Sequence, residues 1–274
     1  MQVVICCLAK NEEKYINDFV KWYLGIGVDK LYIYDNNDRK KGNALEIAID
    51  SNYLPKCEII NVRGKKGVCF QHDIYTEFYN THKDTFDWCF FIDIDEYLTN
   101  VSNIKMLLSL PIYRKYNQIR VKWRLFGDDD MITRDMSLPL YKAFKKPVTS
   151  SLSKSLDNKG NLERQGKCIV RGGLPSLTFT SVHYARYSGG RIVESCLPSG
   201  EPCYSTTVIK EKYNACSIFL NHYMTKTISE FIEQKLNRND AVFNTSIKLD
   251  YFWQINKKTE EKLRYIEHKL GSIE

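Results

Sequence analysis

Blocks of apolar and polar residues alternate along residues 1–125 of the chain. Four short apolar runs have the length of buried strands, at residues 3–8, 31–34, 58–62 and 88–92. The intervening segments repeat apolar residues at helical spacing, at residues 11–24, at 43–53 and after Gly67. This order predicts a β-α-β-α-β-α-β series, and hence an α/β fold with a mixed, mainly parallel sheet flanked by helices.

The second half of the chain is less regular. Further strands are predicted at residues 118–123, 168–171 and 177–183. Residues 145–160 are rich in lysine, serine and turn-forming residues and are predicted as a loop. Thr227 and Glu230 have the spacing of a capping box, which predicts a helix there, and residues 259–270 predict an amphipathic helix.

The composition narrows the class of protein. With 274 residues, 43% of them hydrophobic and 27% charged, the chain is long enough for one sizeable core. Its apolar runs fall short of the ~20 residues that cross a membrane, and residues 1–10 are interpreted as a first strand rather than a signal peptide. The nine cysteines include no C-x-x-C pair, which favours free thiols in a reducing cytoplasm.

The formal charge of +7 is modest. It is compatible with anionic substrates or a negatively charged membrane surface, and equally with unremarkable surface chemistry. The sequence has no concentrated basic stripe, so we do not expect it to bind nucleic acid.

The strongest chemical signal follows the fourth apolar run. Asp93 and Asp95 lie two residues apart at the end of this strand, and side chains with that spacing on an extended strand point to one side. Such a pair would suit Mg²⁺ or Mn²⁺ holding a diphosphate; the alternative is a strand that ends in a solvated acidic turn. Asp35 ends the second strand, and ligands of parallel sheets bind beyond the strands' carboxyl ends, which favours a functional site.

Short motifs accompany these elements through the chain. They are Ala9–Glu13, Trp22–Val28, Tyr32–Asn36, Gln71, Asp87–Trp88, Phe91–Tyr97, Arg124–Gly127, Lys167–Arg171, His183–Tyr184, Leu220–Lys226, Glu230–Phe231 and Lys235. In this order and spacing, across residues 3–240, they resemble the GT-A glycosyltransferases, with the closest match to the family 92 and bacterial family 2-like group. The resemblance implies a Rossmann-like GT-A fold and a metal-dependent transferase that uses a sugar nucleotide.

The resemblance also implies roles for individual residues. In this fold the end of the first strand and the turn after the second hold the nucleoside, which points to Asn11 and Asp35. Asp93 and Asp95 match the Asp-x-Asp motif. Asp93 would lie near the ribose and the metal, and Asp95 would be the more direct ligand of Mn²⁺ or Mg²⁺.

Two pairs of residues would complete the diphosphate site. A histidine late in the domain often serves the metal and the diphosphate, and His183 and His222 are both candidates. Lys167 or Arg171 would add fixed positive charge for the sugar nucleotide, although either is equally well interpreted as a solvated strand flank.

An inverting transfer needs a base near the acceptor hydroxyl. The cluster Asp128 to Asp130 is the favoured source, with Asp129 and Asp130 as catalytic candidates, because repulsion between adjacent carboxylates raises a pKa. The alternative is a surface acidic turn, and the family pattern has small residues at these positions. Glu96 is interpreted either as a helix start or as a group that steadies the metal carboxylates.

The leading hypothesis is a cytoplasmic, metal-dependent hexosyltransferase. Residues 1–125 would bind a UDP-sugar and residues 126–274 would form the acceptor side of one continuous domain. The enzyme would glycosylate a carbohydrate or lipid-linked glycan with inversion, in surface polysaccharide synthesis, and dock at the inner face of the cell membrane. Two alternatives stay open: a non-catalytic sugar-nucleotide or carbohydrate-binding protein of the same fold, and an Asp-x-Asp phosphatase.

Overall fold

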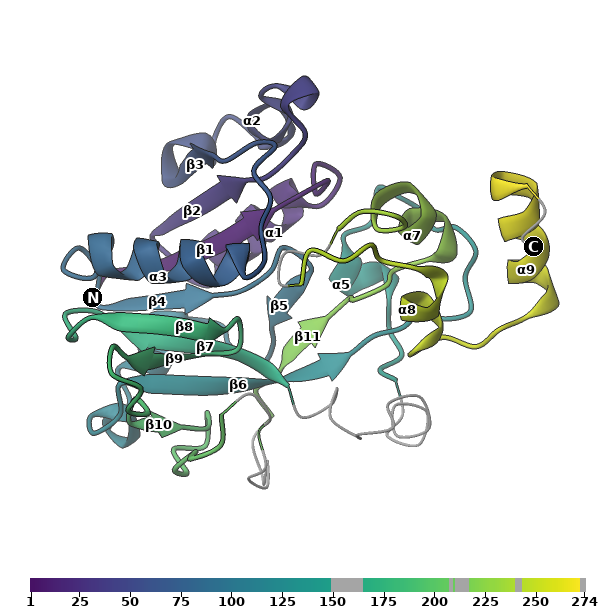
Figure 1. Cartoon of the computed structure of the whole chain (residues 1–274). Coiled ribbons are helices and arrows are strands. Elements are labelled where there is room, and N and C mark those ends of the chain that lie inside the picture. The colour runs from purple at the N-terminus through teal and green to yellow at the C-terminus, as the bar shows by residue number, and fades with distance from the viewer. Residues whose placement is uncertain (149–164, 207–208, 210–216, 240–242, 272–274) are drawn as a thin grey trace.

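The computed structural model describes residues 1–148, 165–206, 209, 217–239 and 243–271. Within these residues a sheet of nine strands runs through the molecule (Figure 1). In spatial order its strands are β3 (Cys57–Asn61), β2 (Lys30–Asp35), β1 (Val3–Ala9), β4 (Trp88–Phe91), β7 (Gly166–Arg171), β6 (Gln118–Leu125), β11 (Leu220–His222) and β5 (Glu96–Leu98), with β10 (Ser195–Cys196) paired to β6. A separate hairpin consists of β8 (Leu177–Ser181) and β9 (Tyr184–Tyr187).

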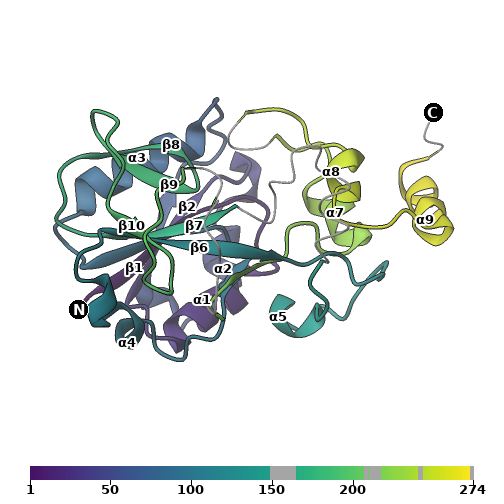
Figure 2. The same cartoon turned by 90° about the horizontal axis from the view of Figure 1, so that it is seen from below.

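Helices cover both faces of this sheet. The described α-helices are α1 (Ile16–Gly25), α2 (Ala44–Ala48), α3 (Phe70–His82), α4 (Ile104–Leu108), α5 (Leu140–Ala143), α7 (Ile228–Gln234), α8 (Leu249–Trp253) and α9 (Glu260–Leu270). Figure 2 shows α3 and the β8–β9 hairpin on one side of the sheet and α1 and α4 on the other. Helices α7, α8 and α9 lie at the end of the molecule away from the N-terminus (Figure 1).

Alternation along β1 explains why both faces of the sheet are buried. Val3 and Ile5 belong to the apolar cluster that includes Phe19 of α1. Val4 and Cys6, which point to the other face, belong to the cluster formed with α3 and the β8–β9 hairpin. A strand covered on both faces has a continuous apolar sequence, which is the pattern of residues 3–8.

The pairing of the strands fixes where their ends meet. β1 pairs in parallel with β2 and β4, and β2 pairs in parallel with β3. β7 is antiparallel to both β4 and β6, and β5 is antiparallel to β11. The predicted mixed, mainly parallel α/β fold with flanking helices is confirmed. The segments that follow β1, β2 and β4 therefore meet at one edge of the sheet.

Several predicted elements differ in detail from those observed. The helix predicted at 43–53 ends at Ala48, and the side chain of Asp50 then accepts a hydrogen bond from the backbone N–H of Asn52, which closes a turn. Thr227 and Glu230 form the predicted capping box at the start of α7. Of the loop predicted at 145–160, residues 149–160 lie outside the described residues. No described helix combines the length and apolar character needed to cross a bilayer.

Candidate functional site

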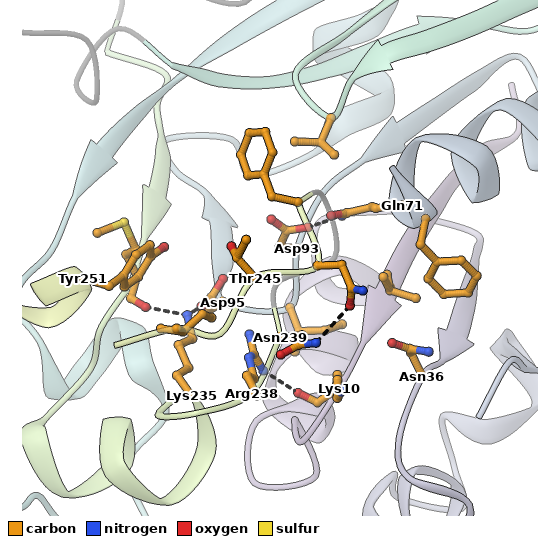
Figure 3. Close-up of a pocket in the computed structure, with 18 of the residues that line it drawn as sticks. Lys10, Asn36, Gln71, Asp93, Asp95, Lys235, Arg238, Asn239, Thr245 and Tyr251 are labelled. Carbon is orange, nitrogen blue, oxygen red and sulfur yellow. Dashed lines mark hydrogen bonds and ion pairs between the residues drawn. The ribbon is translucent and has the colours of Figure 1, made fainter. Parts of the chain in front are cut away.

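A cavity of about 560 Å³ lies at the edge of the sheet where β1, β2 and β4 end. Lys10 lines it from the residue after β1, Asn36 from the residue after β2, and Asp93 and Asp95 from the segment after β4. More of the wall comes from the segment that begins with Lys235 at the end of α7 (Figure 3). Small-molecule sites span roughly 300–1,000 Å³, so the cavity has room for a ligand of that class.

Asp93 lies in a turn between β4 and β5, closed by the backbone N–H of Glu96 and the carbonyl of Asp93 at 3.2 Å. A turn therefore brings both Asp93 and Asp95 to the cavity. The prediction that they lie along an extended strand is wrong. Asp93 Oδ1 accepts a hydrogen bond from Gln71 Nε2 at 2.7 Å, and Oδ2 lies 2.8 Å from Lys167 Nζ. Burial raises the pKa of Asp93, but the Lys167 ammonium outweighs it and holds the pKa below its usual value.

Asp95 is 4% exposed and is surrounded by basic groups. Its Oδ2 accepts hydrogen bonds from Lys226 Nζ at 3.0 Å and Lys235 Nζ at 2.8 Å. On the other side Oδ1 lies 3.5 Å from His222 Nε2. Burial raises the pKa of Asp95, and the two ammonium groups outweigh burial, so the pKa lies well below its usual value.

Glu96 supports this turn from inside the protein. It is fully buried, and it begins strand β5 rather than a helix, so the helix-start interpretation is wrong. Its Oε2 accepts from the backbone N–H of Asp93 at 3.0 Å and its Oε1 from Trp123 Nε1 at 2.7 Å. Burial raises the pKa of Glu96 well above its usual value.

The two candidate histidines flank Trp123 and both line the cavity. His183 Nδ1 lies 2.8 Å from the carbonyl of Gly166, and burial lowers its pKa to about 3, so the ring is neutral at physiological pH. His222 faces Asp95, and its Nδ1 is buried without a hydrogen-bond partner among the described residues. The sequence left the choice between the histidines open, and the structure places His222 beside the acidic pair.

Lys167 and Arg171 lie on the same strand but at different ends of it. Lys167 is fully buried behind Asp93. Because β7 runs antiparallel to β4, Arg171 pairs with Trp88 at the far end of that strand. Its guanidinium lies 4.3 Å from the centroid of the Trp88 ring and donates to the carbonyl of Tyr116. The expectation that Arg171 serves the same site is therefore wrong.

Asn11 and Asp35 lie close to the cavity but do not line it. Asp35 is fully buried and forms an ion pair with Arg63. The amide of Asn11 donates to a backbone carbonyl of α7 at 3.3 Å. Their chain neighbours Lys10 and Asn36 line the cavity instead. At each of these two strand ends, the residue next to the predicted one therefore lines the cavity.

The structure does not bring the cluster Asp128 to Asp130 into the cavity. Asp128 is buried and forms an ion pair with Lys262 of α9. Asp129 Oδ2 accepts the backbone N–H of Lys145 at 2.8 Å, so it closes a loop. The side chain of Asp130 is 65% exposed. These contacts are those of a structural turn.

Four residues in the cavity wall or directly behind it were not singled out as site candidates by sequence reasoning. Lys226 and Lys235 belong to the motifs quoted above, but their contact with Asp95 spans more than 130 positions and cannot be read from spacing. Arg238 Nη1 donates to the carbonyl of Lys10 at 2.8 Å. Glu12 is buried, with one carboxylate oxygen 3.8 Å from Arg238 and the other without a hydrogen-bond partner in the described part of the chain.

The side chains as they stand do not fit the expected Mn²⁺ or Mg²⁺. No group of three or more His, Cys, Asp or Glu side chains in the described residues is arranged to hold a metal ion. All four carboxylate oxygens of Asp93 and Asp95 have polar partners, and three of these partners are lysine ammonium groups. A divalent cation at Asp93 Oδ2 or Asp95 Oδ2 would compete with these ammonium groups.

Comparisons with known proteins give a likeness in structure only. No protein-family model matches the chain, and no curated protein matches it. The chain is similar to S. aureus TarS, with a TM-score of 0.32 and 14% identity over 48% of this chain and 23% of that chain. For S. aureus TarS 1–349 the TM-score is 0.34 and the identity 12%, over 62% of this chain and 47% of that chain. For the apo structure of the bifunctional glycosyltransferase WbbM the TM-score is 0.31 and the identity 13%, over 62% of this chain and 31% of that chain.

The chain spans less than half the length of each of these solved structures. At these TM-scores the likeness carries no information about activity or substrate. What the molecule does has to be argued from its own cavity.

Proposed function

We propose that this chain is a glycosyltransferase that moves a hexose from a nucleoside-diphosphate sugar, a UDP-sugar, to a carbohydrate or lipid-linked glycan. The observation that carries the proposal is the turn of Asp93 and Asp95, whose carboxylates position buried ammonium groups at a cavity beyond β1, β2 and β4. Ligands of open α/β sheets bind at such an edge. The resemblance of the sequence motifs to GT-A glycosyltransferases names the chemistry.

The reaction explains why basic groups would gather there. Transfer breaks the bond between the anomeric carbon and a diphosphate oxygen, and negative charge then develops on the leaving diphosphate. Positive groups that are already in position stabilise such charge most strongly where water is excluded. Lys235 and Arg238 line the cavity, and the Lys235 side chain is only 8% exposed.

Other residues of the cavity wall would suit the nucleoside. Leu8 and Phe70 supply apolar surface there, and Asn36 and Lys10 supply polar groups. An apolar wall with a few polar groups is the usual lining of a site for a planar base. Uridine is the base we propose, on the basis of the family resemblance.

Further details of the reaction are proposals of the same kind. We propose inversion at the anomeric carbon and a role in surface polysaccharide synthesis. We also propose a cytoplasmic location and docking at the inner membrane face to reach a lipid-linked acceptor. The predicted dependence on Mn²⁺ or Mg²⁺ stays a prediction.

A thermal-shift panel of UDP, GDP, ADP and CDP and their sugar conjugates tests the proposal, each measured with Mn²⁺, with Mg²⁺ and with excess EDTA. Stabilisation by one nucleotide family is the expected result. Binding to the native state raises stability by roughly 2.7 kcal/mol when the ligand is at a hundred times its Kd. If no nucleotide raises the melting temperature in any of these conditions, the transferase proposal fails.

The two alternatives give different results in the same series. A binding protein would be stabilised by a nucleotide sugar but would release no free nucleotide from it during long incubation. A phosphatase would instead release inorganic phosphate from simple phosphoesters. Asp93 would be its nucleophile, yet both oxygens of that carboxylate are held by Gln71 and Lys167, which disfavours attack.

A further inference from the structure

We infer that this site holds the diphosphate of its sugar nucleotide with lysine and arginine side chains, in the place that the sequence assigns to a divalent metal ion. The inference rests on the proposed function and deepens it, because it names the groups that bind the leaving diphosphate. In this arrangement Asp93 and Asp95 are positioning residues. They orient ammonium groups instead of ligating a cation.

The first observation is the arrangement of ammonium groups around the acidic turn. Lys167 Nζ lies 2.8 Å from Asp93 Oδ2. Lys226 Nζ and Lys235 Nζ both contact Asp95 Oδ2, at 3.0 Å and 2.8 Å. Lys235 Nζ also donates to the carbonyl of Met224, which fixes its position further. Two ammonium groups on one carboxylate oxygen leave positive charge in excess there, and that excess attracts an anion.

The second observation is the backbone at Lys226. This residue has a φ of +59°, in the left-handed region, and it is 1% exposed. A long side chain in that conformation is uncommon, and such strain is retained where the surrounding structure imposes it, often at functional sites. Here it places Nζ against Asp95 and 4.6 Å from the centroid of the Tyr15 ring. The ammonium group is therefore held against Asp95 by a backbone conformation that a long side chain rarely adopts.

The third observation is the charge of the cavity wall as a whole. Its basic residues are Lys10, Lys65, Lys66, Lys235, Arg238 and Lys248. Its acidic residues are Glu12, Asp93 and Asp95, and Lys167 and Lys226 lie directly behind the last two. Mg²⁺ is usually bound by one or two carboxylates together with water and substrate phosphates, and both carboxylates of this turn already pair with lysine ammonium groups. This wall has an excess of basic groups, which is the requirement of a phosphate-rich ligand.

Arg238 extends the basic surface toward the first strand. Its Nη1 donates to the carbonyl of Lys10 at 2.8 Å (Figure 3). The same nitrogen lies 3.8 Å from Glu12 Oε1. The guanidinium is thereby held between α7 and the end of β1. A held guanidinium binds phosphate oxygens with a smaller loss of side-chain freedom than a mobile one.

Isothermal titration calorimetry with UDP as the probe tests the inference, on the full chain treated with EDTA and then supplied with Mn²⁺ or left without it. We expect UDP to bind the EDTA-treated protein, with an affinity that falls as salt is added. Lys235→Met should weaken UDP binding roughly 10- to 100-fold, the usual loss for one charge-assisted contact. Lys235→Arg keeps the charge and should retain most of the affinity.

A rescue measurement sharpens the test. With Lys235 replaced by methionine, an oxygen of Asp95 loses one ammonium partner, so Mn²⁺ should now restore part of the UDP affinity. Lys14→Met is the matched control, because Lys14 forms an exposed ion pair with Glu233 of α7. That variant should bind UDP within about twofold of the parent. Melting curves without ligand show whether each variant is folded.

The outcomes separate the inference from the function on which it rests. If the parent protein binds UDP only when Mn²⁺ is present, the inference is overturned while the proposed function stands with its predicted metal. Equal UDP affinity for the parent and a folded Lys235→Met variant also overturns it. If no nucleotide binds in any condition, the proposed function fails, and the inference fails with it.

Discussion

Two acidic segments of this chain follow buried strands, and they have different surroundings. Asp93 and Asp95 follow β4 at the cavity, where ammonium groups of three lysines face them. Asp128 to Asp130 follow β6, where one carboxylate pairs with Lys262 and another accepts backbone N–H groups of a loop. Both segments form ion pairs with lysine side chains, but of the two only the first lies at the cavity. A run of acids at a strand end therefore indicates a site only when the strand ends at a cavity.

The largest expected effect comes from removing the carboxylate at the cavity. Asp95→Ala would leave Lys226 and Lys235 buried without their partner, which lowers the free energy of unfolding by about 3–5 kcal/mol. Because those ammonium groups would lose their positions, release of UDP from its sugar conjugate should fall roughly 100-fold or more. Urea unfolding and a UDP-release assay measure the two effects. Parent-like activity in a folded variant would remove Asp95 from the site.

The second acidic segment should respond in stability alone. Asp128→Ala leaves the ammonium of Lys262, itself 1% exposed, without its buried partner, so the free energy of unfolding should fall by about 3 kcal/mol. UDP affinity measured by calorimetry should not change. The double variant with Lys262→Met should recover part of the loss, as a double-mutant cycle would show. A clear drop in UDP affinity would contradict the distinction between the two segments.

The sequence could predict most of the fold because its strands are covered on both faces. The apolar runs at 3–8 and 88–92 correspond to β1 and β4, and the Thr227 capping box begins α7 as predicted. Local spacing determines such features. The prediction that Arg171 serves the site was wrong because β7 runs antiparallel to β4, which puts Arg171 at the opposite end of the sheet from Asp93. Local spacing does not reveal the direction of a strand, which depends on the whole topology.

The site was predicted only in part, for the same reason. The acidic pair and its strand end were visible in the sequence, whereas the partners that decide its chemistry come from distant segments. Lys235 lies 140 positions from Asp95 in the chain, and Lys262 follows Asp128 by a similar distance. The sequence alone therefore could not show which acidic segment has a cavity beside it and which packs against α9.

A smaller effect is expected at Glu230 of α7, whose carboxylate links the segment after β1 to the segment after β6. Its Oε1 accepts from Tyr15 at 2.8 Å on the β1 side and from Arg134 at 2.9 Å on the β6 side. Burial raises the pKa of Glu230, but Arg134 and the hydrogen bonds outweigh it, so the pKa lies below its usual value. A carboxyl with a lowered pKa contributes stability that is present above its unfolded-state pKa and is lost as the pH falls through the folded-state pKa.

Glu230→Gln should therefore lower the free energy of unfolding by about 2 kcal/mol at neutral pH, since the buried Arg134 loses its charged partner. The difference from the parent should begin to shrink as the pH falls below about 4.3, the ordinary value for glutamate, because the carboxyl of the unfolded state is then protonated, and it should be lost as the pH falls through the lower folded-state pKa. Urea unfolding at several pH values measures this. A difference that does not change with pH would mean that Glu230 stabilises α7 only through its neutral capping hydrogen bonds.

The smallest effect is expected at Asp130, the most exposed acid of the second segment. Its φ of +62° is one that asparagine also tolerates, and its carboxylate lies 3.7 Å from Lys262, whose closer partner is Asp128. Asp130→Asn should change the free energy of unfolding by less than about 0.5 kcal/mol. Steady-state kinetics decide the catalytic question. If Asp130 is the predicted base for the acceptor hydroxyl, kcat should fall by roughly 10²–10⁴-fold with little change in UDP affinity. We expect no such fall, because the described contacts make this segment a structural turn.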